Sequence, residues 1–475
     1  MKRKFPIIVS GILLCTTLFS GCSHKMPIVD KSTTNLNSQS TDNQNQGLNN
    51  QDSDNQSVNN QDTNNQNTNN QNTNNQVTQN SELRNSPTPK AIVIPDNSKI
   101  DSNEIVAPDI EFEPKEIPSN PAITFVHNMK IGWNLGNTFD AVSDTNLMDE
   151  LKYESSWSGI KTTEEMIVAL KETGFRSIRI PVSWHNHVSS DDFIISEVWL
   201  NRVQEVVDYA INNDMYVILN THHDVSKDFY YPSIENLESS KKYINAIWTQ
   251  VSERFSSYGE KLIFEGMNEP RLAGSNYEWW LDLSKPECKE TIECINQLNQ
   301  EFVDTVRKSG GENTSRYLLI PGYDASYQYA IINDFKLPKD SINDRLIVSV
   351  HAYLPYDFAL KSPKESGSIT KWNSKIAGCT KEIDSFLNSL YGKFIKNGVP
   401  VIIGEFGARD KDNNLQSRVE YATYYVGAAR ANGITCFWWD NHAFKGDGEN
   451  FGIFDRKTCT MKYPEILQGL MKYAD

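Results

Sequence analysis

The sequence predicts an α/β fold, a (β/α)8 barrel, that occupies the chain after Pro121. From there on, short apolar runs rich in Ile and Val alternate with longer amphipathic stretches. Runs of this length suit strands that are buried on both faces, as in a parallel sheet. Eight such runs that alternate with helices over about 350 residues indicate a (β/α)8 barrel. A doubly wound open sheet is the alternative, but the GxGxxG turn that would favour it does not follow the first run.

The expected elements of this TIM barrel can be placed along the sequence. The predicted strands are KIGWNLG from Lys130, FRSIRIPVSW from Phe175, MYVILNTHHD from Met215, KLIFEGMNEP from Lys261, RYLLIPGY from Arg316, LIVSVHAYLP from Leu346, VPVIIGEFG from Val399 and GITCFWWDN from Gly433. Helices are predicted over 162–172, 197–212, 290–309, 381–397 and 416–432. Thr162 and Glu165 match a capping box at the first helix start. Gly174, Gly398 and Gly433 lie just before strands, where helices tend to end.

The first residues have the pattern of a targeting segment. Met1–Lys4 carry positive charge, and the apolar stretch 5–19 is too short for a confident membrane span. Small residues at 20–21 then precede Cys22, an order that resembles a bacterial lipoprotein processing site. We therefore expect residues 1–21 to be a signal peptide and Cys22 to be the lipidated first residue of an extracellular protein. Ordinary cleavage followed by free secretion is the alternative.

A disordered tether is expected over residues 22–120, before a catalytic barrel at 121–475. Asn35–Asn80 consists mostly of Asn, Gln, Asp, Ser and Thr, so it has almost nothing apolar to bury. Prolines recur through Ser81–Pro121, which predicts an extended, stiffer spacer. If Cys22 is anchored, roughly 100 residues of tether give a reach of about 50–60 Å. That distance would hold the barrel clear of a cell surface.

Charge and cysteine content narrow the classes of partner. The formal net charge is −15 and the pI about 5.1, which argues against nucleic acid as a partner. The acidity suits a neutral ligand, and it equally suits a protein that merely stays soluble. The seven cysteines are irregularly spaced without a CxxC pair, so neither a disulfide framework nor a zinc site is expected. Cys288 and Cys294 could form a bridge, with free, partly buried thiols as the alternative.

Polar residues follow seven of the eight predicted strands, at the carboxyl ends where barrels of this type place their chemistry. Glu269 closes the fourth predicted strand and Glu405 the seventh, so we expect them to face each other across the mouth. Two facing carboxyl groups are what retaining glycoside hydrolysis requires, one as nucleophile and one as acid/base. We expect Arg179 and Tyr353 to favour ionised Glu405. Glu269 has no cation next to it in the sequence, so we expect burial to raise its pKa and keep it protonated.

From about Pro121 to the C-terminus the chain resembles glycoside hydrolase family 5, and most of all its subfamily 4 endoglucanases. The matching stretches are IGWNLGNTFDA, RIPVSW, NTHHD, GMNEPR, SVHAYLPYDFAL, IIGEFGA and FWWDNHAF, in the family's order. The resemblance implies a retaining endo-β-1,4-glucanase that hydrolyses β-glucan polysaccharides without a cofactor or metal. It implies Glu269 as acid/base and Glu405 as nucleophile. It also implies an active site whose substrate-binding residues include Arg179, His222, His223, Asn268, His351, Tyr353 and Trp439.

Further contacts with sugars are expected around these positions. By the resemblance, Asn268 binds the sugar 2-hydroxyl, and Trp439 rather than Trp438 forms the floor under that sugar. Asn137 and Asp140 end the first predicted strand, and Asp140 is expected to bind a sugar hydroxyl rather than to act as acid or base. Aromatic residues in the expected loops are candidate sugar platforms, with packing under the loops as the alternative for half or more: Trp157, Tyr277, Trp279, Trp280, Tyr356, Phe358 and Phe444.

The sequence is also compatible with other functions. His222, His223 and Asp224, joined by His351, could ligate a metal, although no further carboxylate is spaced to complete a dinuclear site. A surface glycan-binding protein without activity is the alternative from another class. Within the enzyme class, the substrate could be xyloglucan, mixed-linkage glucan or mannan. We expect a monomer with no nucleic-acid partner and with membrane contact only through a lipid at Cys22.

Overall fold

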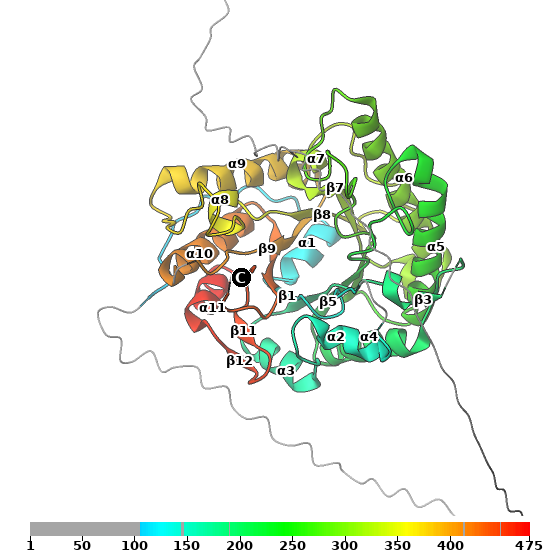
Figure 1. Cartoon of the computed structure of the whole chain (residues 1–475). Helices are drawn as coiled ribbons and strands as arrows, with labels where there is room; N and C mark the ends of the chain where they lie inside the picture. The colour runs from blue at the N-terminus through cyan, green and yellow to red at the C-terminus, as the bar shows by residue number, and fades with distance from the viewer. Residues whose placement is uncertain (1–104, 144–146, 190, 412–413, 447) are drawn as a thin grey trace, which may run out of the picture. The chain divides into compact units, whose positions relative to one another are not determined.

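The computed structural model describes residues 105–143, 147–189, 191–411, 414–446 and 448–475. Its centre is a closed barrel of eight parallel strands, with helices around the outside (Figure 1). The expected signal peptide, the expected lipidation site Cys22 and the expected tether through residue 104 lie outside the described residues. Among the described residues, no helix combines the length and apolarity needed to cross a membrane.

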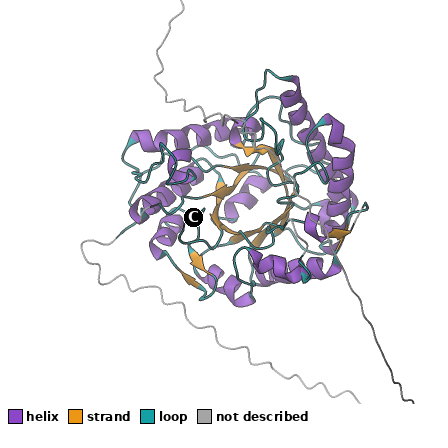
Figure 2. Cartoon of the chain, in the orientation of Figure 1, coloured by secondary structure: helices purple, strands orange, loops and turns teal. Residues whose placement is uncertain are grey.

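The barrel strands coincide with the eight predicted runs, which confirms the predicted fold. They are β1 (Gly132–Leu135), β2 (Ser177–Ile180), β5 (Tyr216–Asn220), β6 (Leu262–Glu265), β7 (Leu318–Ser326), β8 (Leu346–His351), β9 (Val401–Phe406) and β10 (Thr435–Asp440). Neighbours in the chain pair side by side, and β10 pairs with β1 to close the ring (Figure 2). Two short antiparallel pairs lie outside it: β3 (Val188–Ser189) with β4 (Ile194–Ile195), and β11 (Phe454–Asp455) with β12 (Thr460–Met461).

All helices but the first lie around the outside of the ring, and the set includes the five predicted ones. They are α1 (Pro121–Asn128), α2 (Tyr153–Ser156), α3 (Glu164–Glu172), α4 (Glu197–Asn212), α5 (Leu237–Arg254), α6 (Pro286–Lys308), α7 (Tyr327–Ala330), α8 (Tyr356–Ala359), α9 (Ala377–Lys393), α10 (Leu415–Ala431) and α11 (Pro464–Met471). The predicted cap of α3 is wrong by one residue, because Thr163 accepts the Met166 N–H while Thr162 donates its own N–H to Glu154.

The helix ends expected from glycine are confirmed at all three positions. Gly174, Gly398 and Gly433 have φ angles of 111°, 81° and 74°, in the left-handed region that favours glycine. Each of these glycines lies two or three residues before a barrel strand: β2, β9 and β10, respectively.

One end of the barrel interior is apolar because α1 closes it. Figure 1 shows this helix inside the ring of strands. Phe125 of α1 stacks on Tyr317 with ring centroids 3.8 Å apart. The first residues of two strands anchor the segment, since Ser177 Oγ donates to the Met129 carbonyl and Thr435 Oγ1 donates to the Val126 carbonyl. The amino ends of the strands are thereby sealed, and polar side chains are left to the carboxyl ends.

Residues 105–120, called the strap here, pack against α10 and against the residues that follow α11. The ring of Phe112 lies against Gly427 in α10 and meets the ring of Tyr473 edge-on at 5.2 Å. The Lys115 N–H donates to the Ala431 carbonyl at 2.8 Å. The expectation of a disordered tether up to residue 120 is therefore wrong for the strap, because apolar side chains between its prolines have a helix surface to cover.

The bridge considered between Cys288 and Cys294 is absent. Both are free, buried thiols of α6. Residues six apart on a helix lie on different faces, so these two sulfur atoms point apart.

Candidate active site

Glu269 and Glu405 meet at the carboxyl end of the barrel, as predicted. Glu405 belongs to β9, and Glu269 follows β6 by four residues. One oxygen of each carboxyl group and one nitrogen of His351 all lie within 4.8 Å of one another. This separation suits the nucleophile and acid/base of a retaining hydrolase, at about 5–5.5 Å, and is too short for the about 6.5–9.5 Å of an inverting one.

Two donors hold the Glu405 carboxylate. Arg179 Nη1 donates to Oε1 at 2.8 Å, and the Tyr353 hydroxyl donates to Oε2 at 3.0 Å. Burial, followed by the charge of Glu405, raises the pKa of Tyr353 well above its ordinary value, so its hydroxyl keeps the proton that it donates. The expected contacts of Arg179 and Tyr353 with Glu405 are confirmed.

Arg179 acts through protein side chains and not by contact with a sugar. It is fully buried, and its donors point to Glu405, to Glu265 Oε2 at 2.7 Å and to Asn268 Oδ1 at 2.6 Å. Its assignment as a substrate-binding residue is therefore wrong, because no part of it reaches solvent. Glu265, which sequence reasoning missed, also accepts from Ser349 Oγ at 2.5 Å. An acid inside an apolar strand was the available signal.

The environment of Glu269 differs from the predicted one. Burial alone would raise its pKa, but the hydrogen bond from His351 Nδ1 at 2.7 Å and the charges of His351, Arg271 and His223 lower it to about 2. Burial lowers the pKa of His351, but the negative charge of Glu405 and the hydrogen bond and charge of Glu269 outweigh this effect, so the pKa of His351 is raised. The expectation of a raised Glu269 pKa is wrong, because Arg271 follows it by two residues and His351 reaches it from β8. The Glu269–His351 pair thus shares one proton.

A flat floor lies beside these carboxyl groups. Trp439 is 8% exposed and lies over Gly136, where an added Cβ would come within 2.8 Å of its ring. His222 is parallel to that ring, with centroids 5.9 Å apart. Trp438 is fully buried and donates its indole N–H to the Phe451 carbonyl, so only Trp439 reaches the mouth.

Asn268 presents one free donor to the site. Its Oδ1 accepts from Arg179, and its Nδ2 has no hydrogen-bond partner within the described part of the chain. Arg179 thereby fixes the orientation of the amide with its N–H groups unengaged. An amide held in this way can donate to a sugar hydroxyl.

Asp140 closes a turn and does not reach the mouth, so the expected sugar contact is wrong. It is fully buried, and its oxygens accept the N–H groups of Thr138 at 2.6 Å and Asn137 at 2.9 Å. Burial raises the pKa of Asp140 to about 6 despite these hydrogen bonds. Asn137 itself is half-buried, with a left-handed φ of 55°.

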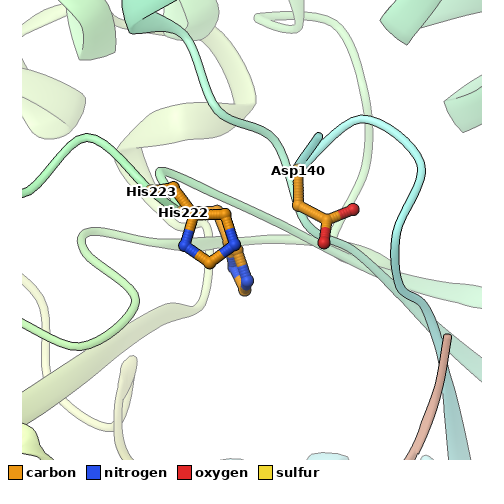
Figure 3. Close-up of side chains that lie close together, drawn as sticks. All are labelled: Asp140, His222 and His223. Carbon is orange, nitrogen blue, oxygen red and sulfur yellow. The ribbon is translucent and has the colours of Figure 1, made fainter. Parts of the chain in front are cut away.

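The alternative metal-binding group has different members in the structure from those considered in the sequence. Asp140, His222 and His223 offer three ligand atoms within 4.8 Å (Figure 3), whereas His351 belongs with Glu269. Both Asp140 oxygens already accept backbone N–H groups, so this group fits a cation poorly. Burial lowers the pKa of both histidines, to about 4 for His223, so their rings are neutral near pH 7.

The candidate sugar platforms divide into exposed and buried rings. Trp157, Trp279 and Trp280 are 44%, 54% and 63% exposed, and Trp157 lies 5.8 Å from His223. Tyr356 is also exposed, whereas Tyr277 and Phe444 are half-buried. Phe358 is buried under its loop, so it is not a platform, and the packing alternative holds for it.

A (β/α)8 barrel with two carboxyl groups at this separation, at the carboxyl ends of its strands, defines a retaining glycoside hydrolase. The family model described as "Cellulase (glycosyl hydrolase family 5)" matches residues 140–445. The chain belongs to glycosyl hydrolase family 5, and it is an enzyme of the endoglucanase type.

Individual relatives agree with this assignment. Endoglucanase B of Ruminococcus albus is 43% identical over 352 residues, which cover 74% of this chain and 80% of that protein. The structure of a glycoside hydrolase 5 lichenase mutant from Caldicellulosiruptor sp. F32 in complex with cellotetraose is 57% identical, with a TM-score of 0.78, over 78% of this chain and 100% of that one. A GH5-4 broad specificity endoglucanase from Ruminococcus champanellensis with bound cellotriose is 41% identical, with a TM-score of 0.68, over 75% of this chain and 100% of that one.

Proposed function

We propose that the protein hydrolyses internal β-1,4 bonds of cellulose-type β-glucans by double displacement, with Glu405 as nucleophile and Glu269 as acid/base. The observation that carries the proposal is the pair of carboxyl groups within 4.8 Å, beside the Trp439 floor. The bound cellotetraose and cellotriose of two similar enzymes support a glucan as substrate.

In the first step, a Glu405 oxygen attacks the anomeric carbon of the sugar on Trp439. The bond between that carbon and the glycosidic oxygen breaks, and Glu269 gives a proton to the leaving oxygen. A glycosyl ester on Glu405 results. Arg179 and Tyr353 hold the carboxylate in line, and the free amide N–H of Asn268 binds the neighbouring 2-hydroxyl.

In the second step, water enters in place of the leaving group. Glu269, now a carboxylate, takes a proton from that water as the oxygen attacks the anomeric carbon and the ester bond breaks. Glu405 leaves as a carboxylate, and the product keeps the configuration of the substrate.

The proton for the first step is stored between His351 and Glu269. In the ligand-free protein it lies toward the histidine, because the pKa of Glu269 is lowered and that of His351 is raised. A bound glucan excludes water from Glu269, which favours the neutral carboxyl group. The proton then moves along the 2.7 Å hydrogen bond from His351 Nδ1 to Glu269 Oε1.

Mixed-linkage β-glucan is the second candidate substrate, because the lichenase is 57% identical to this chain. Xyloglucan and mannan remain alternatives with the same mechanism. A glycan-binding protein without activity is disfavoured, since both glutamates are present at catalytic separation.

We also propose that the enzyme acts outside the cell, tethered by a lipid on Cys22 or freely secreted. The supporting observation is the order of positive, apolar and small residues before Cys22. Globomycin treatment of the expressing cell tests the lipid, because it blocks lipoprotein signal cleavage. Accumulation of the uncleaved form is expected, and unchanged processing would contradict the lipid anchor.

The activity is tested with residues 22–475 by measuring new reducing ends on carboxymethyl cellulose, barley β-glucan, xyloglucan, glucomannan and xylan. Glu269→Gln and Glu405→Gln should each lose activity by orders of magnitude, whereas Glu253→Gln, an exposed matched control on α5, should not. A folded protein that binds glucans but cleaves none of these polymers would contradict the proposed function.

A further inference from the structure

Arg271 joins the acid/base to an exposed aromatic ring. Its guanidinium lies 4.6 Å from the centroid of the Trp279 ring. Its Nη1 donates to the Glu269 carbonyl at 3.1 Å and lies 3.7 Å from Glu269 Oε2. Its Nε donates to Glu278 Oε1 at 3.3 Å, which fixes the guanidinium from the other side. One side chain therefore fixes both Glu269 and the ring of Trp279.

Trp279 remains open to solvent although Arg271 packs on it. Its exposed fraction is 54%, so the ring is only partly covered. An exposed indole backed by a cation is held rigidly without being covered, and it offers an apolar surface to the C–H face of a sugar. No packing within the described residues explains why so large an apolar side chain should face water here.

The strand that Trp279 follows places this residue on the leaving-group side of the scissile bond. The closed order β1-β10-β9-β8-β7-β6-β5-β2 places β6 directly opposite β10. Trp439 lies on β10, whereas Glu269, Arg271 and Trp279 follow β6. If one sugar of a glucan lies on Trp439, the part of the chain beyond the glycosidic oxygen that Glu269 protonates extends toward the β6 side. This part is the leaving group.

We propose that Trp279 binds a glucosyl unit of the leaving group, and that Arg271 is a positioning residue that sets Glu269 against it. The inference rests on the proposed function and adds the residues that bind the departing part of the chain. Binding on this side and protonation of the leaving oxygen are then coupled through a single guanidinium.

The charges around Glu269 give Arg271 a second effect. Groups from other elements face Glu269 as well: His351 from β8, His223 after β5, Asp324 at the end of β7, Glu405 from β9 and Glu449 after β10. Burial raises the pKa of Asp324 well above its ordinary value. A carboxyl group with a raised pKa is ionised less readily, so Asp324 neutralises less of the positive charge of Arg271. A positive charge beside the Glu269–His351 pair makes the shared proton easier to lose. Removal of that charge should therefore raise the pH at which the proton is lost.

The first test compares cellotetraose with 2,4-dinitrophenyl β-cellobioside, whose leaving group carries no sugar and needs little protonation. Trp279→Ala should lower kcat/KM on cellotetraose about tenfold, from the loss of about 1.4 kcal/mol of stacking, and leave the aryl glycoside unchanged. Trp439→Ala is the contrast and should lose activity on both substrates. An equal loss on both substrates for Trp279→Ala would overturn the subsite.

The second test follows the pH dependence of kcat/KM on cellotetraose. In Arg271→Gln the alkaline limb should move up by about 0.5–1 pH unit, whereas Arg271→Lys keeps the charge and should stay near wild type. An unmoved limb in Arg271→Gln would overturn the role of Arg271. Wild-type enzyme inactive on both substrates would instead refute the proposed function, so the two failures are distinguishable.

Discussion

Exchanging one glycine should have opposite effects on stability with and without Phe112. Gly427 lies in α10 under the Phe112 ring, and a Cβ at this position would lie 2.2 Å from a ring carbon, far closer than any real contact. Gly427→Ala must therefore displace the strap. In a Phe112→Ala chain the same exchange meets no ring and only removes a flexible residue from a helix.

The magnitudes follow from these two situations. With Phe112 present, Gly427→Ala should destabilise by about 1–3 kcal/mol, the usual cost of an overpacked site. With Phe112→Ala, Gly427→Ala should stabilise by about 0.5–1 kcal/mol, the helix preference of Ala over Gly. An unfolding entropy of about 2.1 cal/mol/K per residue over about 370 residues converts 2 kcal/mol into a Tm change of about 2–3 °C.

Differential scanning calorimetry measures the Tm of the wild type, Gly427→Ala, Phe112→Ala and the double variant. Gly392→Ala is the matched control, because Gly392 is also helical and an added Cβ there meets no atom within 4 Å. It should raise Tm slightly in both backgrounds. A Tm shift in the same direction with and without Phe112 would contradict this prediction, because the Phe112 ring would then not cover Gly427 in solution.

Three further predictions concern the site. Glu265→Gln should destabilise the protein by about 3–5 kcal/mol in urea unfolding, since it leaves Arg179 with one buried partner fewer. Tyr353→Phe should lower kcat on cellotetraose by about 10²-fold with little change in KM, since it removes one donor to Glu405 that matters most while charge moves in the reaction. His351→Gln should destabilise the protein most between about pH 4.5 and 6.5. The lowered pKa of Glu269 contributes stability above the pKa that this group has in the unfolded chain, and the raised pKa of His351 contributes stability below the pKa that it has in the unfolded chain. The two contributions are both present only in this range.

Each of these predictions has an outcome that contradicts it. Unchanged stability of Glu265→Gln would mean that Arg179 does not need its second carboxylate. A Tyr353→Phe variant with wild-type kcat would remove the hydroxyl from the mechanism. A His351→Gln stability difference that is constant from pH 4 to 8 would show that the pair carries no linked proton.

The barrel could be predicted because its strands have a strong local signature. Buried parallel strands need apolar side chains on both faces, so runs such as Tyr216–Asn220 stand out against amphipathic helices. The strap gave no such signal. Phe112 and Ile117 are isolated apolar residues among prolines, and only the bare surface at Gly427 and Gly433 explains why they pack. That surface exists only after the chain has folded.

In the active site too, features that depend on neighbouring residues in the sequence could be predicted, whereas features that depend on distant residues could not. Glu269 and Glu405 could be predicted because strand ends and motifs are local in sequence. The lowered pKa of Glu269 could not be predicted in full, since His351 is 82 residues away in the chain, although Arg271 lies only two residues after Glu269. The burial of Asp140 also depends on how the chain turns after β1.

Trapping the covalent intermediate would identify which glutamate is the nucleophile. A 2-deoxy-2-fluoro cellobioside with a dinitrophenolate leaving group slows both steps but still allows the ester to form. We expect a mass increase of one fluorinated glycosyl unit, located by peptide mass spectrometry on Glu405 and absent from Glu405→Gln. A label on Glu269, or a folded active enzyme that forms no ester, would contradict the assignment of the two carboxyl groups.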